Sequence, residues 1–351
     1  MSNTIIYTNV DQQIEKLKSQ GLIISDEEFA KHELQVYGYS NLIKSYRDPY
    51  TYSESGKKVY RSGITFEQIL SLFMLDKNLR NAVMGSILDL EELIKESSAD
   101  VIAESFGVDP NQYLQFKNYR DKKKRKQRFT LSAILGKLTN TLSTTKDPIY
   151  HYSQKYNSVP PWILFKSIYL SDIVNFINFF KPPQQVMLVN KLYEPSDLKI
   201  STSELSKLLM DSLFICLEYR NLAAHGGRIY NYTCSSRLRF VEENSKNISG
   251  LSKLFFALNI FKYSAPFDNL HNVLSYQISR HCGMYPEDIT YLGQLMNMNI
   301  ITKKVVWTTK GSKKFHSDPH CSGIKNAIQI SLEDAENQEL FPCKKCYKIT
   351  L

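Results

Sequence analysis

A long helical pattern in the first third of the chain is the feature that most restricts the fold. Apolar residues recur at helical spacing from Phe66 to about Ala103. Thr65, followed three residues later by Gln68, is typical of a helix N-terminus. Because a single helix of that length is unusual, the pattern predicts a helix with a bend near Gly85.

The rest of the first 290 residues also favours helices. Residues 202–225 begin at a Thr202/Ser203 cap and end at Gly226-Gly227, a common helix stop. The apolar segment between two Pro-Pro pairs, 162–180, predicts a helix pair or one kinked helix. We therefore predict a mainly α protein.

The pattern changes from about residue 300. Residues 302–316 are β-branched and alternate in type, which predicts two short strands around a turn at Lys310-Gly311-Ser312. A short helix capped by Ser331 follows. The chain is thus expected to hold a helical domain, 1–290, and a small C-terminal β/α module, 300–351.

Charge indicates the kind of partner. The 351 residues carry 44 Lys+Arg against 35 Asp+Glu, a net charge of +9, which favours a polyanionic partner. The hydrophobic fraction of 42% excludes disorder over most of the length. A basic insertion at about 118–130 is predicted to bind RNA phosphates, with a solvated loop as the alternative. Its cations are Lys122, Lys123, Lys124, Arg125, Lys126 and Arg128.

The chain shows no sign of export or of membrane insertion. The first residues lack a basic segment followed by an apolar core, and no stretch reaches the ~18 consecutive apolar residues of a membrane span. We expect a cytoplasmic protein without a membrane partner. In that reducing setting, clustered cysteines bind metal more often than they form disulfides.

Four residues near the C-terminus have the spacing of a zinc site. Cys343 and Cys346 form a C-x-x-C pair, and Cys321 with a histidine would complete the tetrahedral shell that Zn²⁺ prefers. His316 is the favoured fourth ligand because it ends the predicted strand, and His320, adjacent to Cys321, is the alternative. Four protein ligands close the shell, so the predicted zinc is structural.

The end of the 202–225 helix carries a second group of reactive residues. Arg220, Asn221 and His225 suit RNA cleavage without a metal, since histidine can move the proton of a 2′-hydroxyl and arginine can hold the phosphate. Asn221 and His225 share a helix face, whereas Arg220 and His225 lie about 140° apart on an ideal helix. The alternative is a capping histidine, with Arg220 in a salt bridge to Glu218.

The sequence RNLAAHGGRIYN resembles the R-N-x-x-x-H signature of HEPN-domain ribonucleases. Three stretches, 11–46, 65–107 and 160–177, resemble the Abi-like (AbiD/AbiF-type, abortive infection) family in the same order, so the resemblance covers about residues 10–280. The C-terminal layout is similar to the small zinc module of the Ada methyl-repair protein.

These resemblances imply a HEPN-type helical bundle and a toxin-like endoribonuclease of bacterial anti-phage defence. Carried over by position, Arg220 would bind the phosphate, Asn221 would orient the reacting groups and His225 would act as acid and base, with no metal needed for catalysis. The family further implies an active site at a homodimer interface. RNA would be the substrate, and a small structured RNA or an antitoxin would be the inhibitor.

Two other functions fit the same sequence. A non-catalytic protein could hold a small structured RNA on its helical part and zinc module. A regulator could bind duplex DNA through the module, where lysines such as Lys313 and Lys314 lie close to the zinc ligands.

Overall fold

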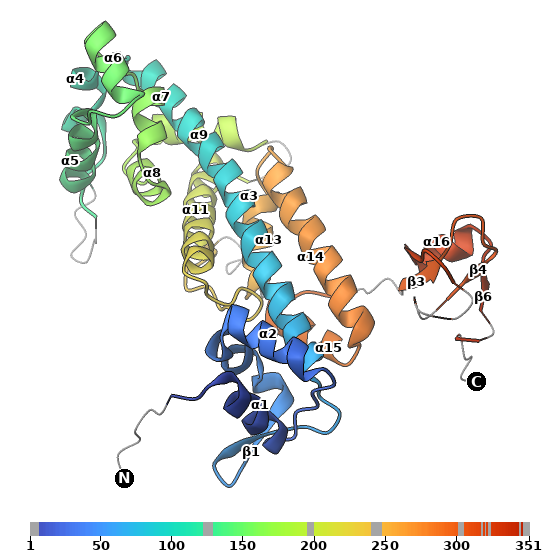
Figure 1. Cartoon of the computed structure of the whole chain (residues 1–351). Coiled ribbons are helices and arrows are strands. Elements are labelled where there is room, and N and C mark those ends of the chain that lie inside the picture. The colour runs from blue at the N-terminus through green and yellow to red at the C-terminus, as the bar shows by residue number, and fades with distance from the viewer. Residues whose placement is uncertain are drawn as a thin grey trace. The chain divides into compact units, whose positions relative to one another are not determined.

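The chain is mainly helical, as its sequence predicts. The computed structural model describes residues 7–121, 129–194, 200–239, 248–300, 305–316, 319, 321, 324–343 and 345–346. Figure 1 shows the helices in chain order and the small strands near the C-terminus. The backbone divides into two compact units, Met1–Asn78 with Leu274–Tyr291 and Ile300–Leu351, and Leu79–Val273 with Leu292–Asn299. The division into domains 1–290 and 300–351 stays a prediction.

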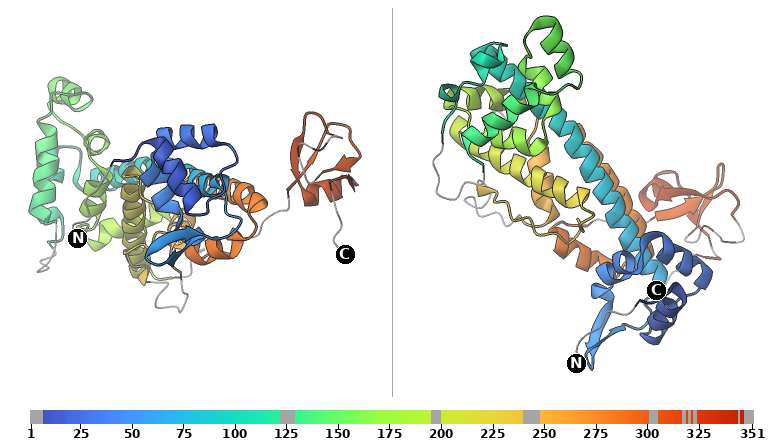
Figure 2. Two further views of the ribbon diagram at one scale, coloured as in Figure 1. Left: turned by 60° about the horizontal axis from the view of Figure 1, so that its bottom comes forward. Right: turned by 60° about the vertical axis from the view of Figure 1, so that its left-hand side comes forward.

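The longest element, α3 (Phe66–Phe106), contributes residues to both units. It is one continuous helix of 41 residues, with Thr65 Oγ1 accepting from the Gln68 N–H at 3.2 Å. Figure 2 shows α3 as a long helix without a sharp bend along its length, so the expected bend is not seen. Asn269 packs beside Gly85 and donates a hydrogen bond to Ser86 Oγ at 3.1 Å.

The first unit contains short helices and a hairpin. Its elements are α1 (Val10–Ser19), α2 (Glu27–Tyr37), the π-helical turn η1 (Ser40–Lys44), η2 (Asp48–Tyr50), β1 (Thr51–Glu54), β2 (Lys57–Tyr60), the start of α3 and parts of α14 (Ala265–Met284) and α15 (Asp288–Met296). Strands β1 and β2 pair antiparallel around Ser55 and Gly56, which both have positive φ. The sequence pattern does not predict this hairpin.

A buried polar network joins α3, α14 and α15 within the first unit. Asp288 accepts hydrogen bonds from Tyr50 at 2.7 Å and from Gln68 at 3.3 Å. The same carboxylate oxygen lies 2.9 Å from His281 Nε2, and the other ring nitrogen, Nδ1, lies 2.9 Å from Ser71 Oγ. His281 is only 1% exposed, so the network satisfies a histidine that packing has removed from water.

The second unit is built around α11 (Thr202–Ala224). Its other elements are the rest of α3, α14 and α15, with α4 (Pro110–Tyr113), η3 (Phe116–Asn118), α5 (Leu131–Leu142), α6 (Ile149–Tyr156), α7 (Pro161–Leu164), η4 (Phe165–Ser167), α8 (Leu170–Ile177), α9 (Pro182–Leu192) and α13 (Leu251–Asn259). Helices α8, α9 and α13 pack directly against α11. The apolar segment between the Pro-Pro pairs forms separate short helices rather than one kinked helix.

The C-terminal module consists of short strands and one helix. Strand β3 (Val305–Thr308) pairs antiparallel with β5 (Ile328–Ser331), and β4 (Lys314–Phe315) pairs parallel with β6 (Phe341–Pro342). Helix α16 (Leu332–Asn337) begins at Ser331, whose side chain accepts from the Asp334 N–H as predicted.

Replacing Asp288 tests the buried network. Asp288→Ala would leave His281, Tyr50 and Gln68 without their shared acceptor, so we expect the free energy of unfolding to fall by about 3 kcal/mol. Urea unfolding measures the loss. The control Asp89→Ala removes an exposed carboxylate on α3 and should change stability by less than about 0.5 kcal/mol. Equal losses in the two variants would contradict a structural role for the network.

Candidate functional site

The Arg220–His225 motif lies at the C-terminal end of α11. This helix has 23 residues and begins at a Ser201/Glu204 capping box, one residue before the predicted cap. Asn221 and His225 are exposed, and Arg220 is half-buried. The motif is thus carried by a rigid element, with the imidazole of His225 accessible to a ligand.

Two glycines end α11 directly after His225. The Gly226 N–H donates to the Ala223 carbonyl at 3.1 Å, and the Gly227 N–H donates to the Leu222 carbonyl at 2.9 Å, the paired bonds of a Schellman cap. Gly226 has a φ of +71°, and a Cβ on Gly227 would lie 2.2 Å from Leu222 Cδ1. The positive φ thus favours glycine at position 226, a side chain at position 227 would displace that of Leu222, and the cap holds His225 at the last turn.

The structure brings Arg220 to Asn221 but not to His225. Arg220 Nη1 lies 3.4 Å from Asn221 Oδ1, whereas no hydrogen bond joins Arg220 to His225 in the described part of the chain. The helix stays regular to Ala224 and does not fray towards the glycines. Arg220 Nε is buried and has no hydrogen-bond partner among the described residues, which is unusual for a guanidinium.

A second cation, which the sequence did not single out, lies beside the motif. Arg80 of α3 donates from Nη1 to the Gly226 carbonyl at 3.0 Å. Its sequence position, 140 residues before the motif, carries no local signal for this contact. The end of α11 therefore has guanidinium groups from two helices.

Glu218 holds the chain that follows the motif. Its carboxylate accepts from the Tyr232 hydroxyl at 2.6 Å, from the Ser235 N–H at 2.6 Å and from the Ser236 hydroxyl at 2.6 Å. Burial opposes the charged form, but these hydrogen bonds outweigh it and lower the pKa of Glu218 from 4.5 to about 2. The Glu218 carboxylate therefore holds the loop that contains Tyr232, Ser235 and Ser236. The alternative salt bridge to Arg220 is not observed among the described residues.

A bidentate ion pair anchors a second position after the motif. Arg239 donates to Asp211 Oδ1 from Nη2 at 2.6 Å and from Nε at 3.1 Å. Tyr219 donates from its hydroxyl to the Gly250 carbonyl at 2.8 Å. These contacts tie Arg239 and Gly250 to α11.

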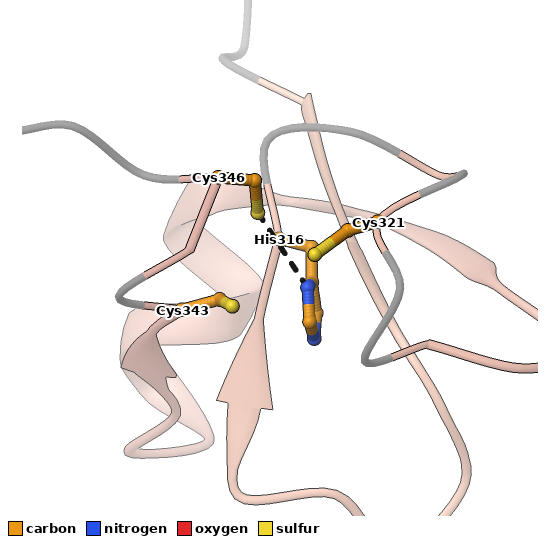
Figure 3. Close-up of side chains that lie close together, drawn as sticks. All are labelled: His316, Cys321, Cys343 and Cys346. Carbon is orange, nitrogen blue, oxygen red and sulfur yellow. Dashed lines mark hydrogen bonds between the residues drawn. The ribbon is translucent and has the colours of Figure 1, made fainter.

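The C-terminal cysteines and one histidine form a candidate metal centre. The ligand atoms of His316, Cys321, Cys343 and Cys346 all lie within 4.8 Å of one another, and Figure 3 shows the side chains pointing towards a common point. His316 Nδ1 lies 3.5 Å from Cys346 Sγ. A tetrahedral zinc with 2.3 Å bonds to sulfur separates its ligands by about 3.8 Å, so this group could hold a zinc ion.

The backbone of the module explains the convergence. His316 bridges antiparallel to Trp307, and the Cys343 N–H donates to the Phe315 carbonyl at 2.8 Å, which sets two ligands on neighbouring strands. The backbone N–H of Lys345 lowers the pKa of the Cys343 thiol and so favours the thiolate that binds metal. The predicted choice of His316 is supported, and His320 lies outside the described residues.

The hydrophobic core of the module is very small. Among the described residues, its buried members are Val306, Phe315 and Ala335, and Ile330, Leu332 and Leu340 pack against them. Modules of about 50 residues with a core this small commonly depend on a metal or a disulfide for their stability. A bound zinc ion would supply that stabilisation.

The three other cysteines are core residues. Cys216, Cys234 and Cys282 are buried and form no disulfide, and burial raises the pKa of each thiol to about 12, as expected of inert core thiols.

The basic run, 122–128, lies outside the described residues, so its predicted RNA contacts stay a prediction.

Comparison with known proteins gives the family. The model of the family described as "Abi-like protein" matches residues 32–231, more than half of the chain. The chain therefore belongs to the Abi-like family, and this membership implies a part in abortive infection, a defence against phage. The match is narrower than the expected 10–280, yet it includes Arg220, Asn221 and His225 and excludes the C-terminal module.

The remaining comparisons add no relative. No curated protein and no solved structure matches the chain. Among the described residues, no helix is both long and apolar enough to span a membrane.

Zinc binding can be tested by metal analysis of the full chain. We expect about one zinc per chain, because four ligands close a single tetrahedral shell. After dialysis, His316→Ala should retain at most about one tenth of the zinc that the wild-type protein retains. The matched variant His320→Ala should retain wild-type zinc. Wild-type zinc in His316→Ala, together with loss of zinc in His320→Ala, would contradict the proposed set of ligands.

The Glu218 loop should respond to pH. Because the pKa of Glu218 is lower in the folded protein, its stabilising effect is complete above about pH 4.5 and is lost as the pH falls towards 2. The protection factors of the Ser235 and Ser236 amides, which correct for the intrinsic pH dependence of hydrogen exchange, should fall in that window. Glu218→Gln should accelerate the same amides at neutral pH, whereas the exposed control Glu96→Gln should not. Unchanged exchange in Glu218→Gln would remove the anchoring role.

Proposed function

We propose that this Abi-like protein is an endoribonuclease with Arg220, Asn221 and His225 as its catalytic group. The carrying observation is the capped end of α11, where an exposed His225 follows a half-buried Arg220 and the Arg80 guanidinium reaches the Gly226 carbonyl. An accessible imidazole and two guanidinium groups at one helix end suit a phosphate ligand. We further propose that the helical part is a HEPN-type bundle.

The proposed reaction divides the chemistry between two kinds of side chain. His225 takes the proton from a 2′-hydroxyl, whose oxygen attacks the adjacent phosphorus. The bond from phosphorus to the 5′-oxygen then breaks, and that oxygen receives a proton from a second acid. The products are a 2′,3′-cyclic phosphate and a 5′-hydroxyl, with no external reactant.

Cations would stabilise the charge on the phosphate. Arg220 can donate to its non-bridging oxygens, and Arg80 adds a second guanidinium near Gly226. Asn221, already in contact with Arg220, would orient it or the scissile phosphate. These groups supply the electrostatic part of the catalysis without a metal in the reaction.

One motif per chain leads us to propose a homodimer. A single histidine cannot be both base and acid within one step, so a second copy of His225 from a partner chain would complete the site. The Ada-like module would bind zinc for its own stability. Its exposed lysines, Lys313, Lys314 and Lys345, would supply RNA-binding cations in addition to those of the basic run.

Substitution of His225 is the direct test. In Mg²⁺-free buffer, wild-type protein should cleave RNA, and His225→Ala should lower the rate by about 10²–10⁴ because it removes the acid and base. Arg220→Ala should lower it by about 10²–10³. A cleavage assay on radiolabelled RNA measures both rates, and analysis of the product ends identifies the cyclic phosphate. Chelators are avoided because they would also strip the zinc module.

His32→Ala removes an exposed histidine outside the motif and should leave the cleavage rate unchanged. Specific activity should also fall on dilution if two chains form the site. Cleavage that persists in both motif variants would contradict the assignment. Tight binding of one defined RNA without any cleavage would instead favour a protein that only holds RNA.

A further inference from the structure

A hollow of about 480 Å³ lies beside the N-terminal half of α11, within the second unit. Its walls come from α9, α11 and the segments around Arg120 and Arg239. The volume falls within the range of about 300–1,000 Å³ that small-molecule sites occupy. It is separate from the Arg220–His225 motif, because Lys207 and His225 are 18 residues apart on one helix, or about 27 Å along its axis.

The charge of the hollow has one sign. Arg120, Lys207 and Arg239 line it, and no carboxylate is among its lining residues in the described part of the chain. Neither Arg120 nor Lys207 belongs to a salt bridge among the described residues. Arg239 is held in place by its bidentate ion pair with Asp211, which fixes its guanidinium at the wall of the hollow. Such a group of cations favours an anion with more than one negative charge.

The same hollow has an apolar side. Phe214 and Met210 of α11 and Val186 of α9 line it, and Phe214 is only partly buried. An aromatic ring and a thioether form a surface on which a planar, largely apolar group can pack. Polyphosphate or sulfate alone would leave this surface uncovered.

Amide groups complete the lining. Asn178 and Gln185 face the hollow, and Gln185 donates from Nε2 to the Phe180 carbonyl at 3.0 Å, which orients its Oε1 as an acceptor. Ser203 and Ser206 add hydroxyl groups. Amides beside an apolar surface suit the hydrogen-bonding edge of a nucleobase.

We propose that this hollow is a binding site for a nucleotide with a terminal phosphate. Arg120, Lys207 and Arg239 bind the phosphate, whose charge of about −1.5 to −2 at neutral pH matches several cations better than a phosphodiester does. Phe214 and Met210 pack against the base. The ligand is either a free nucleoside monophosphate or the 5′-phosphorylated end of an RNA. The site does not depend on the proposed nuclease activity.

Binding to adenosine 5′-monophosphate, adenosine and inorganic phosphate tests the site, with calorimetry on the full chain. The monophosphate should bind more tightly than either part alone. Lys207→Ala should weaken its binding by about tenfold, the effect of losing one charge-assisted hydrogen bond. Lys166→Ala removes one exposed positive charge outside the hollow and should leave binding unchanged. Equal losses in both variants, or a monophosphate that binds no better than adenosine, would overturn the proposal.

Two RNAs then identify the source of the ligand. A 5′-phosphorylated decamer and its 5′-hydroxyl counterpart are compared in the His225→Ala background, so that cleavage does not affect the result. A preference for the phosphorylated RNA that Lys207→Ala abolishes supports an RNA end as the ligand. Equal binding of the two RNAs, with Lys207-dependent binding of the monophosphate, supports a free nucleotide. If the protein does not cleave RNA, the binding measurements still distinguish an RNA end from a free nucleotide.

Discussion

The burial of α11 against α8, α9 and α13 is the constraint on which the second unit depends. Apolar residues along its length, including Leu205, Leu213 and Cys216, are removed from water, and each such side chain contributes about 1.5–3 kcal/mol. A helix held this firmly has a fixed direction and a fixed end. The motif at one end and the cationic hollow near the other are therefore set on the same rigid element.

The ends of α11 show how local chemistry uses that rigidity. At its C-terminus, Gly226 and Gly227 satisfy the last carbonyls and leave His225 exposed. About two turns earlier, Glu218 faces the loop that follows α11 and uses its carboxylate to hold that loop. Neighbouring positions on one helix thus have different tasks, since each faces a different surface.

The C-terminal module is stabilised by a different balance. Its apolar core is limited to a few side chains around Phe315, so hydrophobic burial alone is small. A metal ion held by the four converging side chains would compensate for this, because metal binding adds free energy to the folded state alone. The module and the helical units are therefore expected to differ in their response to chelation, while sharing one chain.

Much of the fold followed from the sequence by itself. Helical spacing predicted α3, the Gly-Gly stop predicted the end of α11, and the spacing of His316 and the three cysteines predicted the metal centre, since each pattern reports local geometry or metal chemistry. The contact of Arg80 with Gly226 and the cationic hollow were decided by tertiary structure alone. Both join residues far apart in the chain, and packing, which no local pattern encodes, determines which of these residues meet.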